Sequence, residues 1–181
     1  MSYLSRSHGP ATTDTWDQYD VQACVANDLT QSEMERCLRI IEAGTAVNPD
    51  AARKELPLVQ VMVIARSGDE IVAIGVIKRT RPRYASSIAR SSEFQFSRQT
   101  AELGHVAVDI KHRGNHLSHA ILAKLLTNFE APLFATTDSD YMKRSLRQAG
   151  FKKRGKEWKG RRGALSLWLK QKPPRVRNLD D

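Results

Sequence analysis

The pattern of hydrophobic and polar positions predicts a chain that alternates between helices and strands. In the N-terminal half, residues 57–65 and 70–78 are apolar runs joined by a short polar turn, which predicts a β-hairpin. Residues 30–44 carry apolar side chains at helical spacing. They begin with a capping box, in which Thr30 is the N-cap and Glu33 reaches back to it. A helix is therefore expected before the hairpin.

The C-terminal half continues this alternation. Residues 102–108 predict a strand that leads through a short turn into a helix ending near Leu126. Residues 132–137 predict a buried strand, residues 140–149 the next helix, and residues 151–170 a final hairpin. This order of elements predicts an α/β fold with helices around a mixed, mostly antiparallel sheet.

Three segments lack a clear pattern. Residues 1–20 are expected to be a flexible arm and residues 171–181 an extended basic tail, on either side of one domain of residues 21–170. Residues 79–100 hold five arginines and many serines with little periodicity, so we expect a mobile loop with one short helical turn at most.

Composition narrows the class of protein. The 181 residues, 40% of them hydrophobic, suit one domain with a substantial core. No run approaches the ~20 apolar residues that a membrane span needs, and the first residues lack the apolar core of a secretory signal. Two cysteines, Cys24 and Cys37, do not make a disulfide framework. A cytoplasmic protein is therefore expected.

The turn before the helix that ends near Leu126 carries the most informative chemistry. A helix N-terminus presents unpaired N–H groups and the positive end of the helix dipole. Because Lys111, His112 and Arg113 flank it, this terminus is a candidate anion site. The alternative is an ordinary strand–turn–helix connection that binds nothing.

Residues 102–126 resemble motif A of the GNAT superfamily of N-acetyltransferases, in which an Arg/Gln-x-x-Gly-x-Gly/Ala turn holds the pyrophosphate of acetyl-CoA. The corresponding residues here are Arg113, Gly114, Asn115, His116, Leu117 and Ser118. His116 and Ser118 replace the small residues usual in the family. The resemblance implies acetyl-CoA as cosubstrate, bound by these residues and by backbone amides of the preceding strand at Val106, Ala107 and Val108.

The resemblance extends over about residues 59–170 through the order of elements. Asp140 matches the family's Asn at the start of the next helix, and Gly150–Phe151 match its Gly-Phe pair. The family's general-acid Tyr corresponds to Leu146, which leaves Tyr141 as the nearest candidate acid. The resemblance implies a GNAT-like fold and direct transfer of an acetyl group to an amine. The acceptor amine is not identified.

Two residues of the strand 102–108 are candidates for the base that deprotonates the amine. Glu102 is a carboxylate whose pKa burial would raise toward the working pH, and its alternative role is pairing with an arginine. His105 has an ordinary pKa near neutrality, and its alternative role is packing in the core. Because side chains alternate along a strand, the two are predicted on opposite faces, with at most one facing the substrate.

Other polar residues give weaker signals. His112, His116 and His119 are close in sequence, but no acidic pair nearby completes a coordination shell, so no metal site is predicted. Lys78 and Tyr84 bracket the start of the expected loop. They are either part of an acceptor cleft or ordinary surface residues.

The net charge of +9 is concentrated at the C-terminus. From Lys143 onward there are 14 Lys and Arg against 3 acids, giving +11, whereas the rest of the chain carries −2. This asymmetry suggests RNA or DNA as a partner, or it only solubilises the domain. Together with the departures from motif A at His116 and Leu146, this charge indicates an alternative function, a nucleic-acid-binding protein on the same fold with weak or no catalysis. Charge reversal at Arg161 and Arg162 is expected to leave acetyl-CoA affinity unchanged. Formation of a homodimer stays open.

Overall fold

The structure is a computed structural model and describes residues 18–44 and 48–171, so the predicted arm and tail lie almost wholly outside the described residues. Its strands form one seven-stranded sheet in the order β1-β2-β3-β4-β5-β7-β6. The strands are β1 (Asp20–Cys24), β2 (Val61–Ser67), β3 (Glu70–Lys78), β4 (Ala101–Val108), β5 (Leu133–Thr137), β6 (Lys152–Lys159) and β7 (Ala164–Lys170). Only β4 and β5 pair in parallel, so the predicted mixed, mostly antiparallel sheet is confirmed.

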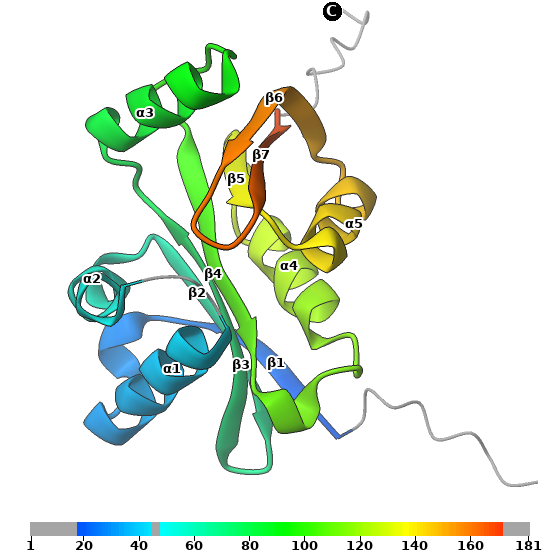
Figure 1. The fold of residues 1–181 in the computed structure, drawn as a ribbon. Coiled ribbons are helices and arrows are strands. Elements are labelled where there is room, and N and C mark those ends of the chain that lie inside the picture. Colours follow the sequence, from blue (N-terminus) through cyan, green and yellow to red (C-terminus); the bar gives the residue numbers. More distant parts are fainter. Residues whose placement is uncertain (1–17, 45–47, 172–181) are drawn as a thin grey trace, which may run out of the picture.

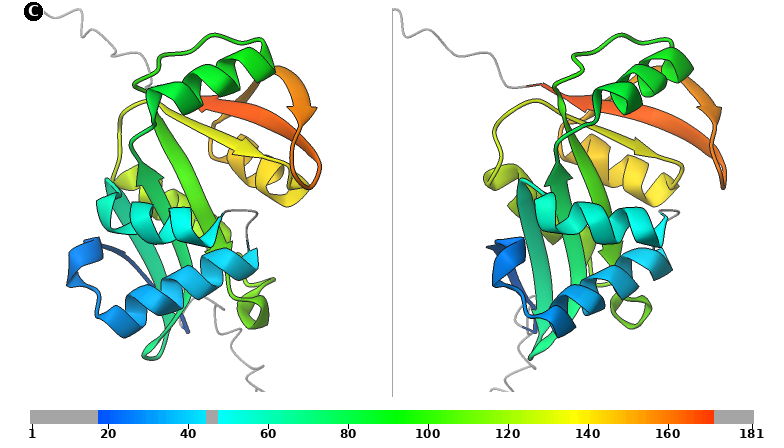
Figure 2. Two further views of the ribbon diagram at one scale, coloured as in Figure 1. Left: turned by 60° about the vertical axis from the view of Figure 1, so that its left-hand side comes forward. Right: turned by 90° about the vertical axis from the view of Figure 1, so that its left-hand side faces the viewer.

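Helices cover both faces of this sheet (Figure 1, Figure 2). One face carries α1 (Gln31–Gly44), α2 (Pro49–Glu55) and α3 (Pro82–Ser92), and the other carries α4 (Leu117–Thr127) and α5 (Asp140–Gln148). Short 3-10 helices connect some elements: η1 (Ala26–Asp28), η2 (Leu56–Leu58) and η3 (Ile110–His112). In the described part of the chain, no helix has the length and apolar character that crossing a bilayer requires.

Local sequence signals explain several of these boundaries. The capping box at α1 is confirmed, since Thr30 N–H donates to Glu33 Oε2 at 2.8 Å and Glu33 N–H donates to Thr30 Oγ1 at 3.2 Å. Ser139 caps α5 by accepting from Met142 N–H at 3.3 Å. The predicted strand 57–65 begins only at Val61, because residues 56–58 form η2.

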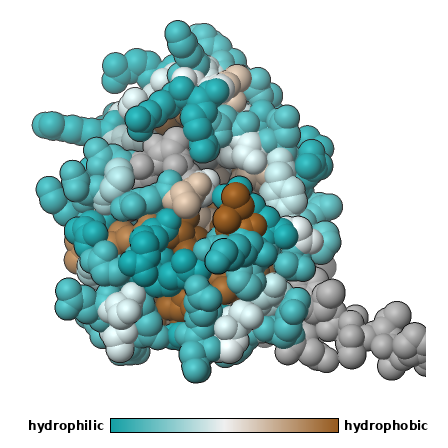
Figure 3. Space-filling view, turned by 60° about the horizontal axis from the view of Figure 1, so that its bottom comes forward, coloured by the Kyte–Doolittle hydropathy of each residue, from teal (hydrophilic) through white to brown (hydrophobic). Residues whose placement is uncertain are grey.

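Helix α4 packs closely against β3. Ile121 and Leu125 of α4 are fully buried against the sheet. Gly75 permits their approach, because a Cβ there would lie 2.3 Å from Ile121 Cγ2 and 2.9 Å from Leu125 Cδ1. Apolar side chains on the face shown in Figure 3 are interrupted by polar ones. Among the described residues visible there, apolar side chains do not form one broad patch of the kind that marks a large interface.

The prediction of a mobile loop over residues 79–100 is wrong, because residues 82–92 form α3. Pro82 occupies the first turn, where its missing N–H costs nothing. Ala85, Ile88 and Ala89 recur at helical spacing and are buried. The many serines and arginines between these positions make the helical periodicity difficult to recognise in the sequence.

Candidate active site

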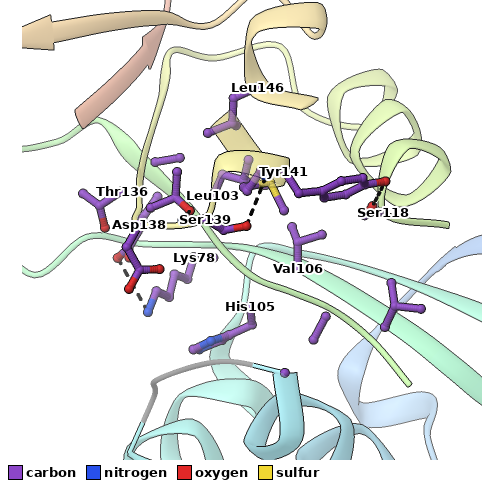
Figure 4. A pocket seen from close by; sticks show the side chains of 18 of the residues that line it. Lys78, Leu103, His105, Val106, Ser118, Thr136, Asp138, Ser139, Tyr141 and Leu146 are labelled. Atoms are coloured by element: carbon purple, nitrogen blue, oxygen red, sulfur yellow. Dashed lines mark hydrogen bonds and ion pairs between the residues drawn. The ribbon is translucent and has the colours of Figure 1, made fainter. Parts of the chain in front are cut away.

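A cleft opens where β4 and β5 separate. The two parallel strands pair only at Ala101–Leu133 and Glu102–Phe134. Beyond these pairs β5 continues its ladder with β7, while β4 stays with β3. The cleft between them has a volume of about 1130 Å³ and is lined by both strands and by α4 and α5 (Figure 4). Unpaired strand edges inside a fold leave backbone groups available to a ligand.

Strand β4 carries a bulge in the wall of this cleft. Its register with β3 shifts between Ile74 and Val76, because β4 has one extra residue between Gly104 and Ala107. His105 lies in the bulge with φ of 51°. Residues other than glycine rarely adopt this left-handed conformation, and such strain is common at functional sites.

The bulge overturns the prediction that Glu102 and His105 point to opposite faces. An extra residue reverses the alternation of side chains along the strand after Gly104. Both candidate bases consequently lie near Glu55, the last residue of α2. His105 Nε2 is 3.9 Å from Glu55 Oε2, and Lys78 Nζ is 3.0 Å from Glu55 Oε2 and 3.6 Å from Glu102 Oε2.

Burial and neighbouring charges set the protonation of this cluster. Burial raises the pKa of Glu102, and the positive charge of Lys78 opposes the shift only in part. Burial, followed by the charge of Lys78, lowers the pKa of His105 to about 4, so its imidazole is neutral near pH 7. For Glu55, burial favours a higher pKa, but the hydrogen bond and charge of Lys78 and the charge of Arg81 outweigh it and lower the pKa.

The imidazole of His105 is unusual in its hydrogen bonding. Its side chain is only 3% exposed. Within residues 18–44 and 48–171, its Nδ1 and Nε2 are the only buried side-chain nitrogen or oxygen atoms without a hydrogen-bond partner. An unsatisfied buried polar group costs about 1–3 kcal/mol. His105 is a lining residue of the cleft, so this unsatisfied imidazole lies in the cleft wall.

The turn before α4 forms the opposite end of the cleft. Gly114 has φ of 86°, and His116, the N-cap of α4, has φ of 55°. His116 thus adopts the left-handed conformation that glycine adopts most easily, at the position where motif A usually has glycine. Ser118 Oγ donates a hydrogen bond to Tyr141 Oη at 3.0 Å, which joins α4 to α5.

Comparison of the sequence with family models and with curated proteins gives no match. Among solved structures, a GNAT-family acetyltransferase from Streptococcus agalactiae 2603 has a TM-score of 0.65 at 11% identity, covering 84% of this chain and 96% of that one. An agmatine N-acetyltransferase gives 0.61 at 10% identity, covering 85% and 99%. A GNAT-family acetyltransferase from Elizabethkingia anophelis with acetyl-CoA bound gives 0.55 at 12% identity, covering 86% and 99%. The chain has the GNAT fold.

Most residues predicted for the site lie together on this GNAT fold. The cleft is lined by Glu102, His105, Val106, Ala107, Val108, Arg113, Gly114, His116, Leu117, Ser118 and Tyr141. Two predicted residues are not among the lining residues. Asn115 donates hydrogen bonds to Tyr19 Oη and His112 O. Asp140 is 82% exposed and pairs with Lys143 at 3.3 Å.

The structure adds residues to the cleft of this GNAT fold that the sequence did not suggest. Asp138 and Ser139 line the cleft where Asp140 was expected to. Both residues directly follow the predicted strand 132–137, and this position could have identified them as candidates from the sequence. Arg161 and Arg162, in the β6–β7 turn, also line the cleft, and Arg162 lies 3.3 Å from Asp138 Oδ1. The β6–β7 turn and the turn before α4 therefore line the same cleft, so the prediction that charge reversal at Arg161 and Arg162 leaves acetyl-CoA affinity unchanged needs a direct measurement.

Proposed function

We propose that this protein is an N-acetyltransferase that transfers an acetyl group from acetyl-CoA to an amine. The observation that carries this proposal is the separation of β4 from β5, which opens a cleft between the edge of β4 and the N-terminus of α4. The GNAT fold supports it, because a solved structure with this fold is described with acetyl-CoA bound.

The residues at the start of α4 suit an anionic group such as a pyrophosphate. The first helical hydrogen bonds are made by His119 and Ala120 to His116 O, so the N–H groups of Leu117 and Ser118 precede them. These groups and the helix dipole favour a phosphate. Arg113 adds a guanidinium to the same end of the cleft. The backbone of residues 106–108, past the last β4–β5 pair, is assigned to the pantetheine arm.

Proton transfer is assigned to Glu102 and Tyr141. When bound, acetyl-CoA supplies a thioester that an amine can attack. Glu102 accepts a proton from the amine, and its raised pKa brings its basicity closer to the working pH. Tyr141 Oη accepts a hydrogen bond from Ser118 Oγ, which leaves its own proton available for donation. His105 lies on the Glu102 side, where its neutral imidazole forms part of the wall at the acceptor end of the cleft.

Calorimetric titration with acetyl-CoA tests this function directly. We expect a dissociation constant on the order of micromolar, in the range common for enzyme substrates. Absence of binding at millimolar acetyl-CoA would overturn the proposal. A coupled thiol assay with a panel of primary amines then identifies the acceptor.

A second candidate function, contact with RNA or DNA, has one specific observation in its favour. Strand β6 is the edge of the sheet, and its exposed side chains include Lys152 and Lys159, which form no ion pair with any described residue. Lys156 pairs with Glu93 at 2.5 Å. Charged side chains on an edge strand also prevent pairing with other chains. Nucleic-acid binding is therefore proposed only as a separable second property.

A further inference from the structure

The ammonium group of Lys78 lies where an acceptor amine is expected. Lys78 is the last residue of β3 and stands opposite Glu102 in the register of β3 and β4. Its Nζ is 3.0 Å from Glu55 Oε2 and 3.6 Å from Glu102 Oε2, and its side chain is 16% exposed. A primary amine is thus held between two carboxylates inside the cleft, beside the proposed base.

The side chain of Lys78 crosses β4 at Gly104. A Cβ on Gly104 would lie 3.2 Å from Lys78 Cε and 3.8 Å from Nζ, so the glycine leaves room for this lysine. Figure 4 shows Lys78 extending into the pocket between His105 and Leu103. Its amine is therefore directed toward ligand space instead of bulk solvent.

Gly104 also lies at the acetyl end of the proposed cofactor path. A cofactor with its pyrophosphate at the start of α4 and its arm along residues 106–108 extends next toward Gly104. The thioester would then arrive beside the amine of Lys78. Proximity of this kind converts a bimolecular reaction into an effectively unimolecular one.

We propose that Lys78 is a self-acetylation site of this protein, an inference that rests on the proposed function. Glu102 takes one proton from the Lys78 ammonium. Nζ then forms a bond with the carbonyl carbon of the acetyl group as the carbon–sulfur bond of the thioester breaks. The second proton lost by Nζ is transferred to the leaving sulfur, so the products are acetylated Lys78 and CoA.

Acetylation would change the electrostatics of the cluster. The amide carries no charge, so Glu55 and Glu102 lose the cation that lies between them. The acetyl group also occupies space next to His105. Acetylation would therefore change the charge and shape of the part of the cleft where other amines are expected to bind. The turn before α4 would stay unchanged.

The test is acetylation of the full-length chain by acetyl-CoA alone, followed by intact-mass measurement and peptide mapping. We expect one acetyl group on Lys78, formed at a rate independent of protein concentration, because the amine reacts within its own molecule. Lys152 and Lys159 are exposed and report non-enzymatic acetylation in the same sample. Lys78→Arg keeps the positive charge and should lose the modification.

Two variants separate enzymatic from chemical modification. Glu102→Gln should slow acetylation of Lys78 by ~10²-fold or more while Lys152 reacts as before. Equal rates at Lys78 in the variant and the wild type would overturn the inference. An unmodified Lys78 in a chain that binds acetyl-CoA would also overturn the inference about Lys78. That result would not contradict the proposed transferase function. A chain that does not bind acetyl-CoA in calorimetry would overturn both.

Discussion

Nε2 of His105 and Oε2 of Glu55 lie 3.9 Å apart, which is too long for a hydrogen bond and short enough for a strong charge interaction. The two residues come from β4 and α2, and only the bulge in β4 directs His105 toward Glu55. The arrangement leaves a buried neutral imidazole beside a carboxylate that is more acidic than usual. Burial and the charge of Lys78 outweigh the attraction of Glu55 and lower the pKa of His105, so protonation of this imidazole should cost folding free energy.

The first prediction is that His105 makes the protein less stable in mild acid. Its folded-state pKa of about 4 lies below the ordinary value of 6.5, so the unfolded chain binds the proton first as the pH falls. The stabilisation is present above about pH 6.5 and is lost as the pH falls toward 4. Between pH 7 and pH 5 the loss should be about 2 kcal/mol.

Urea unfolding of the wild type and His105→Gln at both pH values measures this effect. The raised pKa of Glu102 acts in the opposite direction, because its stability contribution is lost as the pH rises. That contribution is common to both proteins to a first approximation. The variant should therefore lose less stability than the wild type on acidification. The same loss in both would show that His105 does not control it.

The second prediction is that acetyl-CoA affinity depends on the open space at Gly114. No heavy atom lies within 4 Å of a Cβ built there, but its φ of 86° is unfavourable for a side chain. Gly114→Ala therefore tests backbone strain alone, and Gly114→Asp adds a negative charge. We expect the Asp variant to bind acetyl-CoA at least about tenfold more weakly than the Ala variant, or about 1.4 kcal/mol.

Asn128→Asp is the charge control, at the other end of α4. It makes the same change in net charge and should leave acetyl-CoA affinity close to that of the wild type. Calorimetry on the folded variants gives all of these constants. If Gly114→Asp and Gly114→Ala bound equally well, the turn before α4 would not hold the phosphates.

The third prediction is that Glu102→Gln separates chemistry from binding. The amide keeps the shape of the side chain and removes the proton acceptor, so turnover should fall by ~10²–10⁴-fold while acetyl-CoA affinity stays nearly constant. Wild-type activity should rise with pH as Glu102, whose pKa is raised by burial, loses its proton. The variant should lack this rise. An active variant with the wild-type pH profile would assign the role of base to His105 or to no side chain.

Local patterns in the sequence were sufficient for much of this fold. Periodicity and turn residues predict the hairpin of β2 and β3, the strand–turn–helix of β4 and α4, and the final hairpin. The prediction of α3 failed because arginines and serines outnumber the apolar positions that face the sheet. Strand β1 was missed as well, since it has only five residues and lies at the edge of the sheet.

The geometry of the site was harder to predict for a different reason. A β-bulge is a property of two paired strands, and nothing within residues 102–108 marks the extra residue before Ala107. The position of His105 beside Glu55 could therefore not be deduced from strand alternation. Glu55 itself reaches the cleft through tertiary packing of α2, a helix that the sequence pattern did not indicate. The resemblance to motif A located the α4 end of the cleft but not this cluster.

The last prediction concerns the edge strand β6. Because Arg161 and Arg162 line the cleft, changing them alters both candidate functions at once. Lys152 and Lys159 are better probes, since they are exposed and are not among the lining residues of the cleft. Affinity for RNA or DNA held by β6 should fall with salt by roughly 0.9 log units per log unit of salt for each phosphate neutralised.

Replacing Lys152 and Lys159 by Glu should weaken such binding and reduce its salt slope by about two. Acetyl-CoA affinity should not change, because neither lysine belongs to the cleft. Gel-shift titrations of the wild type and the double variant at two salt concentrations, alongside calorimetry, measure both properties. If the wild type binds no RNA or DNA near physiological salt, the lysines of β6 serve to protect the sheet edge. The double variant should then keep the oligomeric state of the wild type, because Glu is charged too.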